Sequence, residues 1–100
     1  MDKNEAVSIV SRYASLLSEK VTFSQCILFG SFAKDTSNSE SDIDVAIVVP
    51  ASAGDFFSLR PLLWKIRRAV DDRIEPVLFT EDHDESGFLT EIRSHGIIVQ

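Results

Sequence analysis

One run of seven residues limits the fold more than any other part of the chain. Ile43-Asp44-Val45-Ala46-Ile47-Val48-Val49 is rich in β-branched side chains and ends at Pro50, which predicts a β-strand. Alternation along this strand places Ile43, Val45, Ile47 and Val49 on one face and Asp42, Asp44, Ala46 and Val48 on the other. Asp44 therefore lies inside an otherwise hydrophobic strand, where an unpaired charge is expensive.

The other periodic segments predict helices that alternate with strands. Apolar residues at three- and four-residue spacing mark helices, and short apolar runs mark strands. The expected helices are Lys3–Glu19, Ser58–Asp71 and Phe88–Ser94, and the further strands are Gln25–Phe29, Ile74–Thr80 and Ile97–Val99. Asp2 and Ser58 have the position of helix N-caps, and Pro61 then falls in a first turn. Pro76 lacks an amide hydrogen, which places its strand at a sheet edge or introduces a break. The order predicts an α/β layer fold.

Length and charge narrow the class of protein. With 100 residues, the chain is expected to form one domain over residues 1–100. The net charge of -6 argues against stable nucleic-acid binding by this chain alone. No apolar stretch approaches the roughly 20 residues of a membrane helix, and the first residues do not have the pattern of a signal peptide. Cys26 is expected to be buried and unpaired. Together these features favour a cytoplasmic protein without membrane contact.

A glycine-serine pair follows the first predicted strand. In Phe29-Gly30-Ser31-Phe32-Ala33-Lys34, Gly30 permits a sharp turn and a close approach of the backbone to a ligand. If a short helical turn follows, the amides of Ser31 and Phe32 point outward and favour an anion, and the Ser31 hydroxyl adds a donor. Lys34 has two interpretations, a contact to the terminal phosphate of a nucleotide or a solvated helix residue.

Three carboxylates form the second candidate feature. Asp42 and Asp44 project from one strand face roughly 6.5–7 Å apart. They belong either to a solvated strand start or to a divalent cation site, and oxygen-only ligands suit Mg²⁺. Glu75 lies in another apolar strand and either pairs with Arg73 or Arg93 or joins the two aspartates. Three carboxylates that face an anion site are what two-metal nucleotidyl transfer requires.

These motifs resemble a known signature. Gly30-Ser31, ten residues, and then Asp42-Ile43-Asp44 is similar to the DNA polymerase beta-like nucleotidyltransferase superfamily, and residues 29–49 resemble its minimal nucleotidyltransferase (MNT) branch. The resemblance implies a small mixed β-sheet flanked by helices. It implies that Gly30 and Ser31 bind a nucleoside triphosphate, with Lys34 as a further candidate, and that Asp42, Asp44 and Glu75 are catalytic and hold two Mg²⁺ ions, with Mn²⁺ as a substitute. Asp35 stands where the family usually has glycine, and Glu75 where it more often has aspartate.

The same resemblance implies a function and a partner. MNT proteins transfer a nucleoside monophosphate, here expected to be AMP from ATP, to a hydroxyl, and the resemblance implies a tyrosine of a HEPN-domain protein as acceptor. The alternative is a non-catalytic antitoxin or assembly subunit that neutralises such a partner by binding. Transfer to a small molecule or to RNA, and self-association into a homo-oligomer, stay open at this point.

Other residues favour structural interpretations. His83 is expected in a turn and His95 at a helix end, and the acidic run 81–85 is expected to face solvent. Trp64, with the neighbouring Lys65, Arg67 and Arg68, is expected to combine core packing with a solvated rim, and it is also a candidate surface for an acidic partner.

Overall fold

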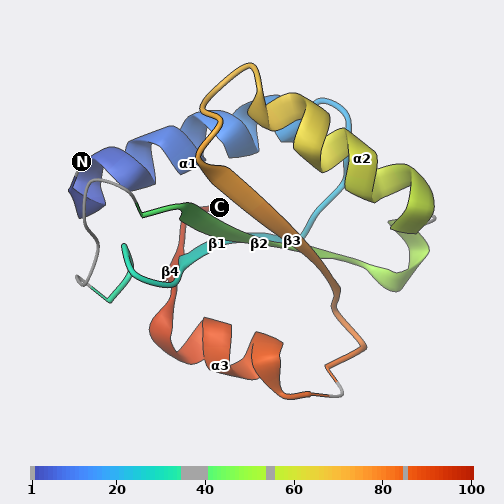
Figure 1. Ribbon diagram of the computed structural model, residues 1–100. Helices are drawn as coiled ribbons and strands as arrows, with labels where there is room; N and C mark the ends of the chain where they lie inside the picture. The colour runs from blue at the N-terminus through green and yellow to red at the C-terminus, as the bar shows by residue number, and fades with distance from the viewer. Residues whose placement is uncertain (1, 35–40, 54–55, 85) are drawn as a thin grey trace.

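The computed structural model describes residues 2–34, 41–53, 56–84 and 86–100. Within these ranges the helices and strands follow one another in the expected order (Figure 1). The elements are α1 (Lys3–Ser18), β1 (Gln25–Phe29), β2 (Ile43–Val49), the short 3-10 helix η1 (Ala51–Ala53), α2 (Phe56–Arg67), β3 (Ile74–Thr80), α3 (Phe88–His95) and β4 (Ile97–Ile98). The bounds of β1, β2 and β3 are those predicted.

The strands form one mixed sheet in the order β3-β2-β1-β4. β1 pairs antiparallel with both β2 and β4, whereas β2 and β3 run parallel. A parallel pair needs a crossover connection, and α2 supplies it. Pro76 lies in the outermost strand, β3, which confirms the expected edge position. The mixed sheet with flanking helices confirms the predicted fold class.

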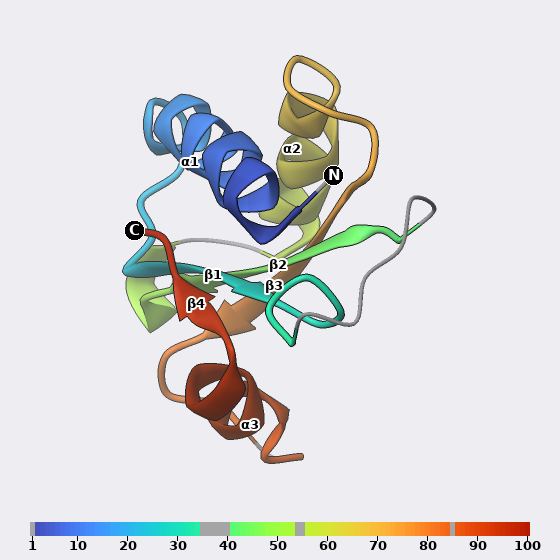
Figure 2. The same cartoon turned by 90° about the vertical axis from the view of Figure 1, so that its left-hand side faces the viewer.

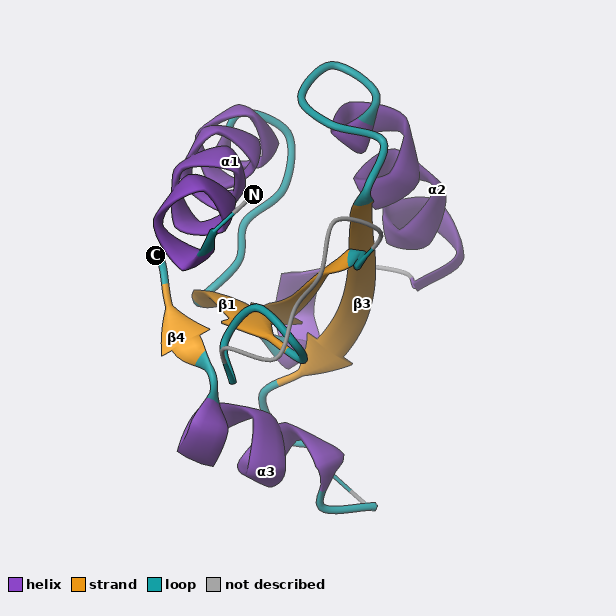
Figure 3. Cartoon of the chain, turned by 60° about the vertical axis from the view of Figure 1, so that its left-hand side comes forward, coloured by secondary structure: helices purple, strands orange, loops and turns teal. Residues whose placement is uncertain are grey.

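Helices cover both faces of this sheet. In Figures 1 to 3, α1 and α2 lie together on one face and α3 lies on the opposite face. The larger core is between the sheet and α1 and α2; among its buried residues are Val10, Tyr13, Leu17, Leu28, Phe32, Ile43, Val45, Ile47, Leu59 and Leu63. The smaller core, under α3, contains Ile27, Ala46, Val48, Leu89 and Ile92. The two faces of β2 therefore divide as its alternation predicts, and Asp44 belongs to the α3 face.

The start of α1 and the end of α3 lie at the predicted capping residues, whereas the start of α2 does not. The carboxylate of Asp2 accepts a hydrogen bond from the amide of Glu5 at 2.8 Å, which confirms Asp2 as N-cap of α1. α3 ends against Gly96, as expected. The prediction for α2 was wrong: it begins at Phe56 rather than after Ser58, and Pro61 lies inside it beyond the first turn. The buried residues Leu59 and Leu63 explain the difference, because packing against the sheet favours the helical backbone on both sides of the proline.

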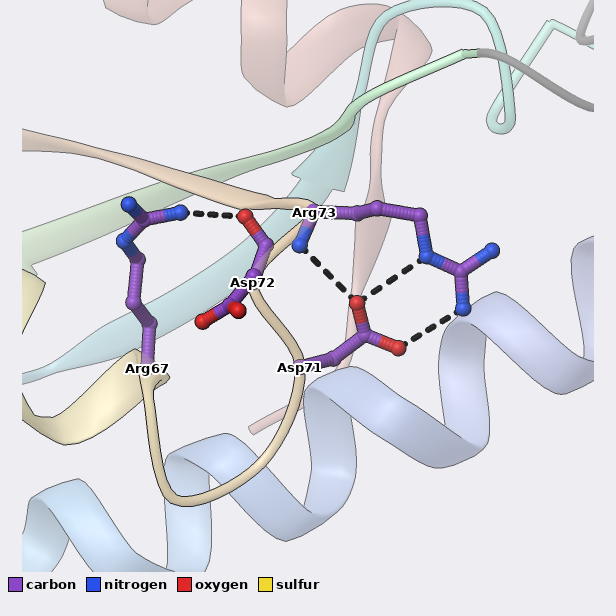
Figure 4. A network of polar contacts seen from close by, with 4 residues as sticks. All are labelled: Arg67, Asp71, Asp72 and Arg73. Atoms are coloured by element: carbon purple, nitrogen blue, oxygen red, sulfur yellow. Dashed lines mark hydrogen bonds and ion pairs between the residues drawn. The ribbon is translucent and has the colours of Figure 1, made fainter.

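A polar network fixes the connection from α2 to β3 (Figure 4). Arg67 donates hydrogen bonds to the carbonyl oxygens of Asp72 and Ile74 and lies 4.5 Å from the ring centroid of Trp64. The Asp71 carboxylate accepts from the Arg73 backbone amide at 2.9 Å and pairs with its guanidinium at 2.7 Å. The Ile43 amide then donates to the Arg73 carbonyl at 2.8 Å, so this connection meets the start of β2.

Two further expectations concern membrane-spanning helices and the single cysteine. No helix in the described part of the chain is long and apolar enough to cross a membrane. Cys26 is a buried free cysteine, as expected, and burial raises the pKa of its thiol to about 12.

Candidate functional site

The Gly30 turn connects β1 to the residues that precede β2. Gly30 has a φ of +76°, in the left-handed region that favours glycine. The Lys34 amide donates to the Gly30 carbonyl at 3.1 Å, so one helix-like turn forms within residues 30–34, where a helical turn was expected. Phe32, with 1% of its surface exposed, anchors this turn in the larger core. The backbone of the Gly30-Ser31 segment is therefore held by packing, while Lys34 is exposed. Asp35 lies outside the described residues.

Asp44 lies directly against Gly30. A Cβ atom added to Gly30 would overlap the Asp44 carboxylate and would stand 3.1 Å from its Cγ atom. Residue 30 must therefore be glycine for two reasons, its backbone angle and the space that the carboxylate fills. The sequence predicted the turn, and the structure adds that this turn and Asp44 are in contact.

The three predicted carboxylates gather at one end of the sheet. Asp44 pairs in register with Glu75 across the parallel β2–β3 ladder, and with Phe29 across the antiparallel β1–β2 ladder. Neighbouring strands lie about 4.8 Å apart, and paired residues point to the same face. Asp42 immediately precedes β2 and is exposed, whereas Asp44 and Glu75 are half-buried. The structure thus brings Glu75 to Asp42 and Asp44.

The electrostatics of this cluster reflect crowded negative charge. Burial, and then the charge of Asp42, raise the pKa of Asp44. Burial is also the main cause that raises the pKa of Glu75, followed by the charge of Asp42, a side-chain hydrogen bond with Asp42 and the charge of Asp44. Arg67 opposes these effects and lowers the Glu75 pKa. Carboxylates in such a cluster resist ionisation unless a cation compensates them.

Glu75 does not pair with Arg73 or Arg93, the two arginines proposed from the sequence as its alternative partners. Arg73 pairs with Asp71, and Nε of Arg93 donates to the side-chain oxygen of Gln25 at 2.9 Å. Both guanidinium groups therefore have other described partners. Glu75 faces the two aspartates instead, which is the arrangement expected for the site.

The donor set fits a hard divalent cation by its chemistry. Asp42, Asp44 and Glu75 offer oxygen atoms only, and the raised pKa values of Asp44 and Glu75 mark a surplus of negative charge. Among the described residues, however, no group of three or more His, Cys, Asp or Glu side chains is placed so that together they could hold a metal ion. Mg²⁺ usually keeps several waters and binds through one or two carboxylates plus substrate phosphates, so an open carboxylate set suits it.

A groove beside Gly30 was not foreseen from the sequence. It has a volume of about 270 Å³, and its lining includes Phe29, Gly30, Lys34, Phe88, Glu91 and His95. His95 is the last residue of α3, as expected, but the fold also places it beside the glycine turn. The available signals were weak: Phe88 is one apolar residue at the start of a short helix. Only the packing of α3 under β1 brings it to the site.

One acidic residue has a structural role that the sequence analysis missed. The expectation that the run 81–85 faces solvent was wrong for Asp84, which is half-buried. Its carboxylate accepts hydrogen bonds from the amides of Leu89 and Thr90, both at 2.9 Å, and from the Thr90 hydroxyl at 2.6 Å. Asp84 thus satisfies free amides at the N-terminus of α3, as a capping side chain does. Glu85 lies outside the described residues, and His83 is an exposed turn residue, as expected.

Comparisons with known proteins agree with this geometry. A crystal structure from Sulfolobus solfataricus, provisionally identified as a nucleotidyltransferase, superposes with a TM-score of 0.68 and 14% sequence identity over 96% of this chain and 80% of that one, which shows a shared fold. A comparison with curated protein sequences gave no significant match. The sequence family described as "Polymerase beta, Nucleotidyltransferase" matches residues 12–100. The chain therefore belongs to the polymerase beta-like nucleotidyltransferase family.

Proposed function

We propose that this nucleotidyltransferase transfers AMP from ATP to a hydroxyl group of a protein acceptor. The observation that carries the proposal is the position of Asp44, which lies against Gly30 on one side and pairs with Glu75 on the other. A phosphate turn and an acceptor-activating carboxylate thus flank one central aspartate. Family membership supports the class of reaction, and this arrangement supports the roles of the individual residues.

The glycine turn is proposed to hold the triphosphate. Gly30 leaves the backbone open to a ligand, and Ser31 contributes an amide and a hydroxyl. Lys34 lies one turn further on, where its ammonium group can neutralise the terminal phosphate. Buried Phe32 keeps the turn in place, so the amides need little rearrangement when the nucleotide binds.

The three carboxylates are proposed to divide two tasks. Asp42 and Asp44 would hold two Mg²⁺ ions, with Mn²⁺ as a substitute, and Glu75 would complete the ligand set. When bound, these ions supply charge neutralisation for the transferring phosphoryl group. Glu75 also accepts the proton of the acceptor hydroxyl, a role for which its position across the β2–β3 pair from Asp44 suits it. The acceptor oxygen then bonds to the α-phosphorus, the bond to the β-phosphate breaks, and pyrophosphate leaves.

The proposed acceptor is a tyrosine of a HEPN-domain protein. This step rests on the likeness of residues 29–49 to the MNT branch, whose members pair with HEPN proteins. The competing function is neutralisation of the same partner by binding alone. Ser31, Asp42, Asp44 and Glu75 are all present, and the last three lie together, which favours a catalytic site over a degenerate one.

Intact-mass spectrometry separates the two functions. A HEPN-domain protein, the proposed partner, is mixed with this chain, ATP and Mg²⁺, and the HEPN protein is weighed. We expect a mass increase of one AMP group, and no increase with Asp42→Asn/Asp44→Asn. The matched control is Asp82→Asn, an exposed acidic residue in the turn after β3. A partner that is neutralised but unmodified would overturn covalent transfer.

A further inference from the structure

We propose that the groove between the Gly30 turn and α3 binds the nucleobase of the triphosphate. This inference rests on the proposed function, because it assumes that the phosphates lie at Gly30 and Ser31. It adds a base subsite, and it names Phe88 as the residue that the base contacts and Glu91 as the residue that selects it.

Position is the first argument. The groove begins at Gly30 itself, the residue that also contacts Asp44. In the sheet order β3-β2-β1-β4, Glu75 approaches Asp44 from β3, and the groove lies on the opposite side, beside β1 and α3. The acceptor hydroxyl must lie near Glu75, which leaves the groove to the nucleotide. The two substrates then enter from different sides of Asp44.

Shape is the second argument. A volume of about 270 Å³ lies just below the range of roughly 300–1,000 Å³ that is typical of drug-sized ligands. The groove therefore accommodates a ring system rather than a complete nucleotide, and the phosphates remain outside it at the turn.

The aromatic lining is the third argument. Phe88 leaves 45% of its surface exposed, although its ring makes edge-to-face contacts with Phe29 and Phe79, each with centroids 5.8 Å apart. These contacts hold the ring in one orientation while part of it stays open to the groove. A fixed, partly exposed ring is suited to stacking on a base, because every base has a π-face.

The polar lining suggests which bases fit. Glu91 is exposed on α3 and lines the groove, and its carboxylate accepts hydrogen bonds when ionised. It therefore favours a base with an exocyclic amine, such as adenine, over one with a carbonyl oxygen at the same position. Lys34 and His95 line the same groove, where their side-chain N–H groups can donate hydrogen bonds to the phosphates that leave it at the turn.

Calorimetry with ATP and with inorganic tripolyphosphate tests the subsite in the wild-type protein and in Phe88→Ala. We expect Phe88→Ala to weaken ATP binding by roughly 5- to 100-fold, the range for loss of one base-stacking contact. Tripolyphosphate has no base, so its affinity should stay the same. The matched control is Phe57→Ala, a phenylalanine with 89% exposure on α2, which should change neither affinity. Thermal denaturation checks that each variant is folded.

A second comparison uses inosine triphosphate, which replaces the adenine amine by a carbonyl oxygen. We expect the wild type to bind ATP roughly 10-fold tighter than inosine triphosphate, and Glu91→Ala to reduce this ratio towards one. Glu91 is exposed, so its removal should leave the fold intact.

The outcomes distinguish the inference from the function on which it rests. If ATP and tripolyphosphate both fail to bind in the presence of Mg²⁺, both proposals fall. If ATP binds and Asp44→Asn abolishes transfer, but Phe88→Ala behaves like Phe57→Ala, only the base subsite is wrong. If Phe88→Ala is unfolded, chemical-shift changes of the groove amides in wild-type protein decide: changes with ATP but not with tripolyphosphate support the subsite, and identical changes overturn it.

Discussion

The carboxylate of Asp44 fills the space that a side chain on Gly30 would need. Gly30 directly follows β1, Asp44 lies in the adjacent antiparallel strand β2, and Phe29, the residue before Gly30, is the register partner of Asp44. Contact between the glycine turn and the Asp44 carboxylate is therefore built into the β1–β2 pairing. Several expected outcomes depend on this contact and on the groups around it.

Gly30→Ala should impair both stability and ATP binding. The substitution adds strain at a φ of +76° and displaces the Asp44 carboxylate, so we expect a loss of about 2–3 kcal/mol in the free energy of unfolding. Gly87→Ala is the matched control: its φ is +73°, but a Cβ atom there meets nothing within 4 Å. It should cost only about 1 kcal/mol and leave ATP binding unchanged. Urea denaturation and calorimetry measure both effects, and equal losses would argue against the contact.

Asp44→Asn should stabilise the protein at neutral pH when no metal is present. The pKa of Asp44 is raised in the folded state, so its ionisation destabilises the fold as pH rises through the unfolded and then the folded pKa. The Asp44→Asn side chain does not ionise, so the variant is free of this destabilisation. Its advantage should be largest at neutral pH and disappear below about pH 3, roughly one unit under the unfolded pKa, where the carboxyl is protonated in both states. Denaturation curves at several pH values measure the difference. Added Mg²⁺ should reverse the order by stabilising the wild type alone.

Glu75 should affect chemistry more than nucleotide binding. Glu75→Gln removes the proton acceptor, and we expect the rate of AMP transfer to fall by roughly 10²-fold or more. Glu75→Asp keeps the carboxylate on a side chain one methylene shorter and should retain more activity than Glu75→Gln. Because Glu75 lies across Asp44 from the glycine turn, ATP affinity should change little in both variants. Single-turnover mass spectrometry and calorimetry give the two readouts. A glutamine variant as active as the aspartate variant would remove Glu75 from the mechanism.

Asp84 should stabilise α3 in a pH-dependent way. Hydrogen bonds from Thr90 and Leu89 lower its pKa, so the stabilisation is present above the unfolded pKa and is lost as pH falls through the lower folded value. Asp84→Ala should increase hydrogen exchange at the amides of Leu89 and Thr90 at neutral pH, and the effect should vanish in strong acid. Asp82→Ala, in the same turn but exposed, is the control and should leave α3 protected.

Local sequence predicted much of this fold for identifiable reasons. The run 43–49 is β-branched and is stopped by Pro50, so its ends were clear, and Asp2 marked the start of α1 by a capping contact within one helical turn. The start of α2 was missed because Pro61 is a strong local signal for a first turn, whereas the packing that overrides it is tertiary. The same limit explains Asp84, whose partners follow five and six residues later in the chain.

In the site, too, residues with a local sequence signal were predicted, and the residues brought there by the tertiary packing of α3 were not. Gly30, Asp42 and Asp44 stand in one short stretch with a recognisable spacing, so sequence alone was enough to propose them as site residues. Glu75 could be proposed only by assuming that its strand adjoins β2, and the parallel register with Asp44 supports that assumption. The groove had no comparable signal, because Phe88 and Gly30 lie far apart in the chain and meet only through the packing of α3.

The parallel pairing of β2 with β3 also has a consequence for the order of folding. Glu75 reaches Asp44 only after the chain has crossed over through α2, and non-local contacts of this kind form late because loop closure must precede them. A nascent chain that has folded only through β2 contains the glycine turn and both aspartates but lacks the third carboxylate. We therefore expect nucleotidyl transfer to begin only when the whole sheet is assembled, so that newly made, incomplete chains are inactive.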